Sequence, residues 1–381
     1  MTESYLGESI GKLGFGNMRL PKKDGVVDDN TANDMVDEFL ANGFTYIDTA
    51  YLYGGSEESL RESLVKRHPR EAYQIATKLT LLFGVENYDD HFKQLNTSLE
   101  RLGLDYLDFY LIHGLSGETI KTAEKAETWR FMRHVKEAGI AGHIGFSFHS
   151  TPEDLEYVLS NHPEVEFVQL QLNYIDWENP EVQSRRLYEI ARKYGKPIVI
   201  MEPTKGGLLA GGESAAAEVL REANPEASVA SWAFRFVGSL EGIITVLSGM
   251  ENTEQIKDNA KTFKEFKPLT EEERLVIGKA IEILNSTQRI PCTTCRYCVP
   301  HCPSKIQIPT FIDIYNKYLM HRQRDSSGYT YASMSAFGAG PAECVKCREC
   351  ERVCPQHIGI SDVMSQLVSE LEEASVPYRR R

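Results

Sequence analysis

The stretch FTYIDTAYLYGGSEESLRESLVKR (44–67) shows the unit from which most of the chain is built. A short run of β-branched and aromatic residues, 44–48, leads into a loop that contains two glycines. The segment SEESLRESLVKR (56–67) follows, with a serine cap and helical spacing. A strand followed by a helix, when repeated, is typical of a parallel sheet.

The same alternation continues to residue 266. Strands are predicted at 12–16, 44–48, 73–77, 107–113, 143–147, 166–172, 197–201 and 242–247. Helices are predicted at about 31–42, 56–67, 88–103, 122–139, 152–160, 179–195 and 252–266. Eight strands alternating with helices in this length predict a (β/α)8 TIM barrel. A doubly wound open sheet is the alternative, but the G-x-G at 14–16 is not a full dinucleotide fingerprint.

All eight cysteines of the 381-residue chain lie beyond residue 291, in CTTCRYCVPHCP (292–303) and CVKCRECERVCP (344–355). We therefore predict a barrel domain over 1–285 and a small, mainly α-helical domain over 286–381. Helices are predicted at 269–284, 308–320 and 361–374, and the Gly/Ser/Ala-rich stretch 326–341 is predicted to be a loop.

Composition narrows the function classes. The net charge of −13 disfavours a nucleic-acid binder, which normally carries a basic face. No apolar run reaches 18 residues, so no membrane span is predicted, and the N-terminus shows no signal peptide. Thiols spaced as metal ligands in such a chain favour a reducing, cytoplasmic setting.

Polar side chains follow three successive predicted strands. Asp48, Lys78 and His113 end strands, and Tyr53 lies on the loop five residues after Asp48. In a TIM barrel the carboxyl ends of the strands carry the chemistry, so these four residues are the predicted catalytic set.

These motifs resemble those of the aldo-keto reductases. The resemblance covers roughly 8–266 and rests on DTAYLYGGSE (48–57), TK (77–78) and LIH (111–113). Further matches are GFGNMRLP (14–21), GFS (145–147), VQLQLNY (168–174) and LSGMENTEQIKDN (247–259). The resemblance implies an oxidoreductase that interconverts a carbonyl and an alcohol.

The predicted chemistry also follows from the residue types. A carbonyl that accepts hydride becomes an alkoxide, which needs a proton and electrostatic help. Tyr53 is the predicted proton donor, and a cationic Lys78 favours its phenolate form. Asp48 is expected to keep Lys78 charged and oriented, while a neutral His113 polarises the carbonyl.

The resemblance implies a nicotinamide dinucleotide cofactor. Ser147 and Gln169 match the positions that hold the carboxamide, and Gly206 and Gly207, with Lys205, are predicted at the pyrophosphate. The full predicted cofactor set is Gly16, Asn17, Met18, Ser147, Gln169, Met201, Lys205, Gly206, Gly207, Gly249, Met250, Gln255 and Asn259.

The chain departs from the family pattern at several of these positions. Met201 replaces the usual ring-stacking tyrosine, and Phe148 replaces a carboxamide-binding asparagine. Gly249, Met250 and Gln255 replace the Lys-Ser pair and the Arg typical of the 2′-phosphate site, whereas Asn259 matches. The choice between NADH and NADPH therefore stays open, and so does a structural reading of 247–259 without a ligand.

The cysteine runs resemble those of dicluster ferredoxins, in which the fourth cysteine of each C-x2-C-x2-C-x3-C-P run binds the other cluster. The resemblance implies two [4Fe–4S] clusters. Cluster one would be held by Cys292, Cys295, Cys298 and Cys354, and cluster two by Cys344, Cys347, Cys350 and Cys302. The long spacer between the runs resembles the alpha-helical ferredoxin type. Zinc is the rival, but its sites usually pair cysteines in twos.

Three functions stay open. In the first, the barrel acts on a small carbonyl or alcohol substrate with NAD(P)(H), and the clusters exchange electrons with a redox partner protein or regulate the barrel. In the second, the chain is an electron-transfer protein, with a bound flavin an unsupported option, or its clusters are structural. In the third, the same acid/base set performs dehydration or isomerisation. The sequence does not define the substrate or the oligomeric state.

Overall fold

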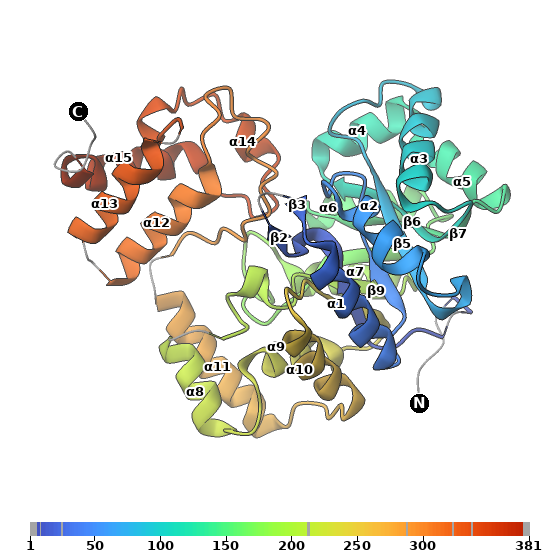
Figure 1. Cartoon of the computed structure of the whole chain (residues 1–381), viewed down its shortest axis with the longest axis horizontal. Coiled ribbons are helices and arrows are strands. Elements are labelled where there is room, and N and C mark those ends of the chain that lie inside the picture. Colours follow the sequence, from blue (N-terminus) through green and yellow to red (C-terminus); the bar gives the residue numbers. More distant parts are fainter. Residues whose placement is uncertain are drawn as a thin grey trace. The chain divides into compact units, whose positions relative to one another are not determined.

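The structure is a computed structural model of the chain and describes residues 6–7, 9–23, 26–211, 214–286, 289–321, 324–336 and 338–375. It divides into two compact units (Figure 1). The first comprises Met1–Thr204, Leu209–Gly211 and Leu220–Ile277, and the second comprises Lys205–Leu208, Gly212–Val219 and Gly278–Arg381. The predicted domain boundary after residue 285 falls inside helix α11 (Glu271–Ser286) and stays a prediction.

In the described part of the first unit, eight parallel strands close into a barrel in the order β1-β10-β9-β8-β7-β6-β5-β4. The predicted (β/α)8 fold is therefore confirmed, and the open sheet is excluded. The strands are β1 (Leu13–Gly16), β4 (Tyr46–Asp48), β5 (Gln74–Thr80), β6 (Leu107–Leu115), β7 (Ala141–Phe148), β8 (Phe167–Gln171), β9 (Ile198–Met201) and β10 (Ile243–Ser248).

Alternation along each strand decides which side chains fill the barrel. Phe109 and Leu111 of β6 belong to the interior cluster, with Tyr46 and Phe167, whereas Tyr110 packs outward against the helices. Both faces of the barrel sheet are buried, so the strand sequences are nearly continuous runs of apolar residues. Gly145 keeps the interior tight, because a Cβ there would lie 2.7 Å from the ring of Phe167.

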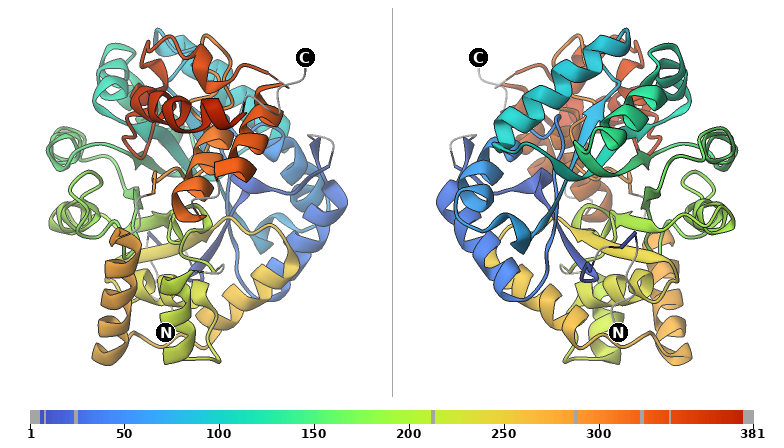
Figure 2. Two further views of the ribbon diagram at one scale, coloured as in Figure 1. Left: turned by 90° about the vertical axis from the view of Figure 1, so that its left-hand side faces the viewer. Right: turned by 90° about the vertical axis from the view of Figure 1, so that its right-hand side faces the viewer.

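Helices surround the strands (Figure 2). They are α1 (Asp29–Ala41), α2 (Ser56–Leu60), α3 (Tyr88–Leu102), α4 (Gly117–Lys125), α5 (Thr128–Glu137), α6 (Pro152–Asn161), α7 (Ser184–Lys193), α9 (Val229–Gly238) and α10 (Thr253–Lys264). Helix α8 (Ala215–Ala223) spans the division between the two units. A π-helical turn (Arg61–Val65) extends α2, and a hairpin of β2 (Lys22–Lys23) and β3 (Val26–Val27) lies outside the barrel sheet.

Two local helix predictions are wrong. The single helix predicted over 122–139 is two helices, because Glu127 adopts a left-handed φ of 56° and the buried Thr128 is held by the His91 imidazole. The helix predicted from 179 begins at Ser184, since Gln183 is also left-handed. The hairpin and helices α8 and α9 had no counterpart among the predicted elements.

The second unit is helical, with α12 (Ile308–His321), α13 (Arg324–Ser335), α14 (Glu349–Arg352) and α15 (Ile360–Ser375). The loop predicted over 326–341 is wrong, since α13 reaches Ser335. Tyr331 explains the difference. It is buried against Phe311, and its hydroxyl donates a hydrogen bond to the Glu372 carboxylate of α15. Packing thus outweighs the weak helix propensity of the Gly and Ser residues.

None of the helices in the described ranges combines the length and apolar character needed to cross a bilayer.

Candidate functional site

Strand alternation brings three of the four predicted catalytic residues to one end of the barrel interior. Asp48 follows the interior residue Tyr46 by two positions, Lys78 follows Ala76, and His113 follows Leu111. Their strands β4, β5 and β6 are adjacent and parallel, so the three side chains share the carboxyl end of the barrel.

Lys78 and Asp48 form a buried ion pair. The Lys78 ammonium donates to Asp48 Oδ1 at 2.6 Å and to the Thr49 carbonyl at 2.7 Å. Their side chains are 0% and 3% exposed. Burial raises the pKa of the Asp48 carboxyl and lowers that of Lys78, and the mutual attraction opposes both shifts. The two hydrogen bonds fix the direction in which the ammonium points.

Tyr53 lies between the charged pair and the histidine. The Lys78 Nζ is 5.2 Å from the centroid of the Tyr53 ring, and the His113 ring meets that ring edge-on at 5.5 Å. Burial, followed by the charges of Lys78 and His149, lowers the pKa of His113 well below its usual value. The site therefore joins a phenol, a cation and a neutral imidazole, which can donate a proton and polarise an oxygen.

The loop that carries Tyr53 is anchored by residues that the sequence analysis missed. Glu57 is 1% exposed and accepts from Thr77 Oγ1 at 2.7 Å and from Arg101 Nη1 at 3.2 Å. The same Arg101 nitrogen donates to the Tyr51 carbonyl at 3.2 Å. Glu57 lies within the motif 48–57, so the sequence could have indicated its role. Nothing in the sequence indicated a role for Arg101.

Several predicted cofactor residues also lie on the interior face of the barrel. Ser147 and Gln169 are paired in register between β7 and β8, and Met201 ends β9. Gln169 is 2% exposed, and its amide donates to the Met201 sulfur at 3.7 Å. Its carbonyl oxygen is buried with no hydrogen-bond partner among the described residues. A ligand amide would satisfy that oxygen, so the residues present fit a nicotinamide carboxamide.

Gly16 ends β1, and Asn17 and Met18 follow it. Gly16 pairs in register with Asp48, and Asn17 donates to the Asp48 carbonyl at 3.1 Å. Asn17 thereby braces the strand end that carries the buried carboxylate.

The turn after β10 is held by its own side chains. Asn259 donates to Ser248 at 3.1 Å, and Gln255 accepts from the Glu251 amide at 2.8 Å. Met250 is buried, whereas Gly249 is open on one side, where a Cβ would lie 3.7 Å from Arg19 Cδ. Arg19 is thus a cation beside this segment that the sequence analysis did not single out.

Lys205, Gly206 and Gly207 belong to a different group. Lys205 and Gly206 lie in the second compact unit, where the Lys205 ammonium is 6% exposed and donates to Gln356 at 3.0 Å. Gly206 has a φ of 65°, and a Cβ there would lie 2.9 Å from Thr293 Cα. The three remain predicted pyrophosphate contacts, and in the structure Lys205 bonds Gln356 and Gly206 lies against Thr293, both in the cysteine-bearing segments.

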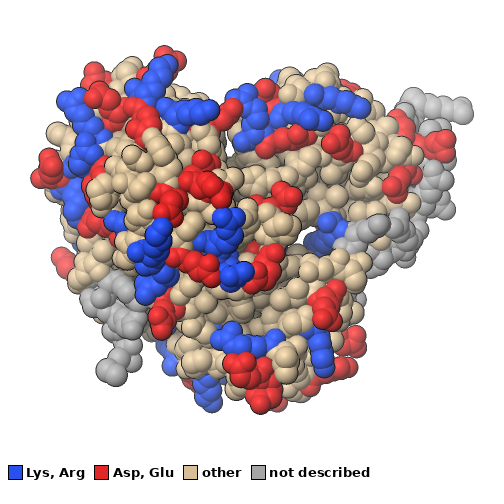
Figure 3. Space-filling model, turned by 180° about the vertical axis from the view of Figure 1, so that it is seen from behind, with Lys and Arg blue, Asp and Glu red and all other residues tan. Residues whose placement is uncertain are grey.

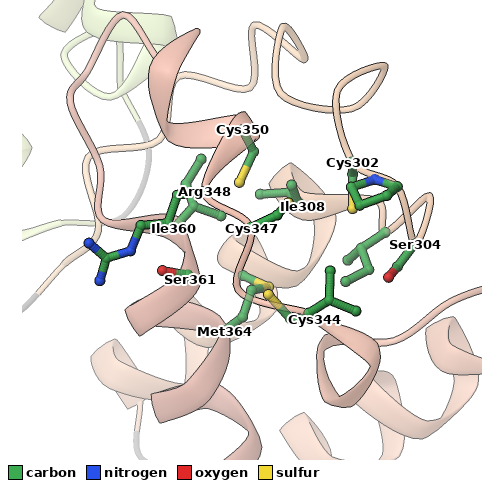
Figure 4. Close-up of a pocket in the computed structure, with 13 residues that line it drawn as sticks. Cys302, Ser304, Ile308, Cys344, Cys347, Arg348, Cys350, Ile360, Ser361 and Met364 are labelled. Atoms are coloured by element: carbon green, nitrogen blue, oxygen red, sulfur yellow. The ribbon is translucent and has the colours of Figure 1, made fainter.

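The second unit contains a cleft lined by four cysteines from both runs (Figure 4). Cys302, Cys344, Cys347 and Cys350 border it, with Ile308, Ile360 and Met364 on its apolar walls, and it holds about 330 Å³ of atom-free space, including the part open to solvent. These four are the set predicted for cluster two, with Cys302 contributed by the first run.

The other four cysteines group around Cys298. Burial, and then the thiols of Cys295, Cys292 and Cys354, raise the pKa of the Cys298 thiol. Burial and neighbouring groups, with Glu351 and Cys302 the largest after burial, raise the pKa of Cys350 to about 12. Clustered thiolates need a cationic centre between them, so both sets fit a metal cluster with soft sulfur ligands. Within the described residues, no three His, Cys, Asp or Glu side chains converge as ligands of a single ion.

The backbone repeats between the two runs at an offset of 52 residues. Positive φ values occur at Thr294 and Lys346, at Arg296 and Arg348, and at Lys305 and His357. Such conformations are uncommon outside glycine, and successive amides turned in this way form concave sites for negative charge. The repetition indicates that both runs wrap the same kind of group.

Fold and site together define a (β/α)8 barrel of the oxidoreductase type joined to an iron–sulfur type unit. Residues 12–281 match the sequence model of the aldo/keto reductase family, and residues 291–358 match the 4Fe-4S dicluster domain. The chain belongs to the aldo/keto reductase family, and the predicted resemblance of both parts is confirmed.

Known relatives agree with this assignment. An aldo-keto reductase of Mycolicibacterium smegmatis is 36% identical over 136 residues, which is 36% of this chain and 46% of that protein. The NAD/NADP-dependent indole-3-acetaldehyde reductase of Schizosaccharomyces pombe is 31% identical over 201 residues, 52% of this chain and 62% of that protein. The chain thus spans about half to three fifths of the length of these curated relatives.

The fold is also matched by solved structures. The holo form of aldo-keto reductase AKR11C1 from Bacillus halodurans has a TM-score of 0.59 at 25% identity and covers 72% of this chain and 93% of its own.

We predict that Glu57→Gln lowers kcat about tenfold, because the loop carrying Tyr53 loses its buried ionic anchor and small displacements of reacting groups are costly. Glu58→Gln is the matched control, since Glu58 pairs with the same Arg101 at 3.2 Å but is 54% exposed. Steady-state kinetics of both variants provide the measurement. Equal kinetics for Glu57→Gln and the wild type, with only the thermal midpoint lowered, would contradict the anchoring role.

We predict that the free energy of unfolding falls as the pH is lowered through about 6.5, which is the pKa of an exposed imidazole. His113 has a depressed pKa in the folded state, so the unfolded chain binds a proton that the folded chain does not. Thermal midpoints between pH 7.5 and 5.5 should fall less for His113→Gln than for the wild type. His134→Gln, at an exposed position, should behave like the wild type; identical slopes for all three proteins would refute the assignment.

Proposed function

We propose that the chain is an NAD(P)(H)-dependent oxidoreductase that interconverts a small carbonyl and its alcohol in the barrel, and that two [4Fe–4S] clusters in the second unit transfer electrons. The arrangement of Tyr53 beside the buried Lys78–Asp48 pair and the neutral His113 carries the barrel proposal. Family membership supports it, because the matched region includes all four residues.

The four side chains divide the work. Tyr53 donates the proton that the substrate oxygen needs as negative charge develops on it, and takes a proton back in the reverse direction. Lys78 stabilises the phenolate that remains, and Asp48 keeps the ammonium charged and aimed. His113 donates a hydrogen bond to the substrate oxygen, a role for a neutral imidazole that its depressed pKa supports.

The nicotinamide, when bound, supplies or accepts the hydride. Gln169 and Ser147 hold its carboxamide, and Gly16 leaves room at the mouth of the barrel because it has no side chain. Met201 offers a flexible apolar contact where a stacking ring is common in the family. Arg19 provides a cation beside Gly249, so the proposal covers both NADH and NADPH.

The clusters, when bound, supply single-electron transfers. We assign cluster one to Cys292, Cys295, Cys298 and Cys354, and cluster two to Cys302, Cys344, Cys347 and Cys350. Each set combines three cysteines of one run with the fourth of the other, as the lining of the cleft and the neighbours of Cys298 support. Eight ligand thiols need a reducing compartment, so we place the protein in the cytoplasm together with a redox partner protein.

We predict that Tyr53→Phe lowers kcat for carbonyl reduction by about 10²–10⁴, because the proton donor is lost while the ring remains. Tyr51→Phe is the matched control on the same loop, with its ring against Arg101 at 4.8 Å. Turnover of a panel of small aldehydes and ketones with NADH and NADPH is the measurement. Full turnover by Tyr53→Phe would refute the proposed reaction chemistry.

Crossed ligation predicts how cysteine variants group. Cys302→Ala and Cys347→Ala should each lose cluster two and leave one and the same residual electron paramagnetic resonance (EPR) spectrum after dithionite reduction. Cys354→Ala and Cys295→Ala should leave the other spectrum, and iron content should halve in all four variants. If Cys302→Ala groups with Cys295→Ala instead, each run binds its own cluster and the assignment is wrong.

A further inference from the structure

The two cysteine runs share a backbone conformation, yet their outward faces differ in exposure. Thr293 of the first run is 3% exposed, whereas Val345, its equivalent 52 residues later, is 67% exposed. The middle cysteines differ in the same direction, since Cys295 is partly buried and Cys347 is exposed. The buried position thus carries a polar residue, and the exposed position carries an apolar one.

A segment of the second unit explains why the first run is covered. Gly206 lies so close to Thr293 that a Cβ would be 2.9 Å from its Cα. In the second run, by contrast, residues 345–349 are all exposed. We call these five residues, VKCRE, the exposed tip.

The exposed tip is basic on both sides of Cys347. Lys346 makes no salt bridge to any described residue, and Arg348, 63% exposed, approaches Glu351 and Asp362 only to 3.9 Å. Figure 4 shows the Arg348 guanidinium directed away from the cysteine sulfurs. Glu349 adds little negative charge, because it pairs with Arg352 at 3.1 Å. Figure 3 shows Lys and Arg side chains interspersed with Asp and Glu on the face drawn there, in a chain whose net charge is −13.

An exposed apolar residue surrounded by charges is the composition of a protein interface, with an apolar centre and a polar rim. We propose that the exposed tip is the docking surface for an acidic one-electron carrier protein, and that electrons reach cluster two at the edge formed by Cys347. The carrier loses one electron and the cluster gains it, and no bond is made or broken. This inference rests on the proposed electron-transfer role of the clusters.

The test uses the full chain with both clusters and a purified acidic [2Fe–2S] ferredoxin as the probe. Stopped-flow absorbance gives the second-order rate constant for cluster reduction at several ionic strengths. Lys346→Glu/Arg348→Glu should lower it at least tenfold at low salt, because steering of an acidic partner is lost. Thr294→Glu/Arg296→Glu changes the equivalent positions of the first run and should leave the rate within twofold of the wild type.

Val345→Ser is the second variant, and it leaves the charge unchanged. It should weaken carrier binding at high salt, where electrostatic steering is screened. If Lys346→Glu/Arg348→Glu loses cluster two, as judged by EPR, Val345→Ser decides the outcome.

Three results overturn the inference in distinguishable ways. If the two double variants slow cluster reduction equally, the effect comes from the net charge of the protein and not from the exposed tip. If dithionite reduces the wild-type clusters but the carrier does not at any ionic strength, the docking surface is refuted. The proposed function is then unaffected. Clusters that neither reagent reduces remove the electron-transfer role itself, and this inference with it.

Discussion

The buried ion pair between Lys78 and Asp48 is the interaction on which the barrel site depends. An ammonium and a carboxylate with almost no exposure are tolerated only when each is paired and hydrogen-bonded, and removing one partner typically costs about 3–5 kcal/mol. Lys78 meets this condition by donating to Asp48 and to the Thr49 carbonyl. The second of these bonds ties the first residue of the Tyr53 loop to the ammonium. The contacts that neutralise the buried ammonium therefore also position the Tyr53 phenol. The Glu57–Arg101 ion pair holds the same loop further along the chain.

The second unit depends on a different constraint, because its core is built around its cysteines. Cys298 and Cys350 are buried in one cluster with Ile306, Ile308 and Leu367. The apolar contacts of a small unit provide only part of the stability it needs. Metal–thiolate bonds would provide the rest. In the proposed assignment the same bonds would join the two runs, since each cysteine set draws on both. Redox and structural roles of the clusters are therefore compatible, and the difference in exposure between the runs favours a redox role.

The sequence predicted the barrel because strand alternation and helix caps are local signals. It singled out Asp48, Lys78 and His113 because they end strands, and Tyr53 because it lies on the loop five residues after Asp48. It missed the break at Glu127 and the helix through Tyr331, both of which depend on tertiary contacts of His91, Phe311 and Glu372. Arg101 could not be found either, since its partners Glu57 and Tyr51 lie more than forty residues earlier. Lys205 shows the opposite limit. Its place before Gly206 and Gly207 led to the prediction of a pyrophosphate contact, which stays a prediction, and the structure adds a hydrogen bond to Gln356, 151 residues later in the chain.

The duplicated run offers a comparison that a single run could not. Two segments with the same cysteine spacing and the same left-handed positions would be expected to present similar faces to solvent. They do not, because Gly206 packs against Thr293 of the first run. Covering one run lowers solvent access to its cysteines, and an exposed Val345 beside Cys347 does the reverse for the other. In the proposed function, hydride transfer in the barrel moves two electrons together, whereas each cluster moves one. A chain that combined both would exchange single electrons with an external carrier, and we propose that the open run is the surface where such a carrier reaches a cluster.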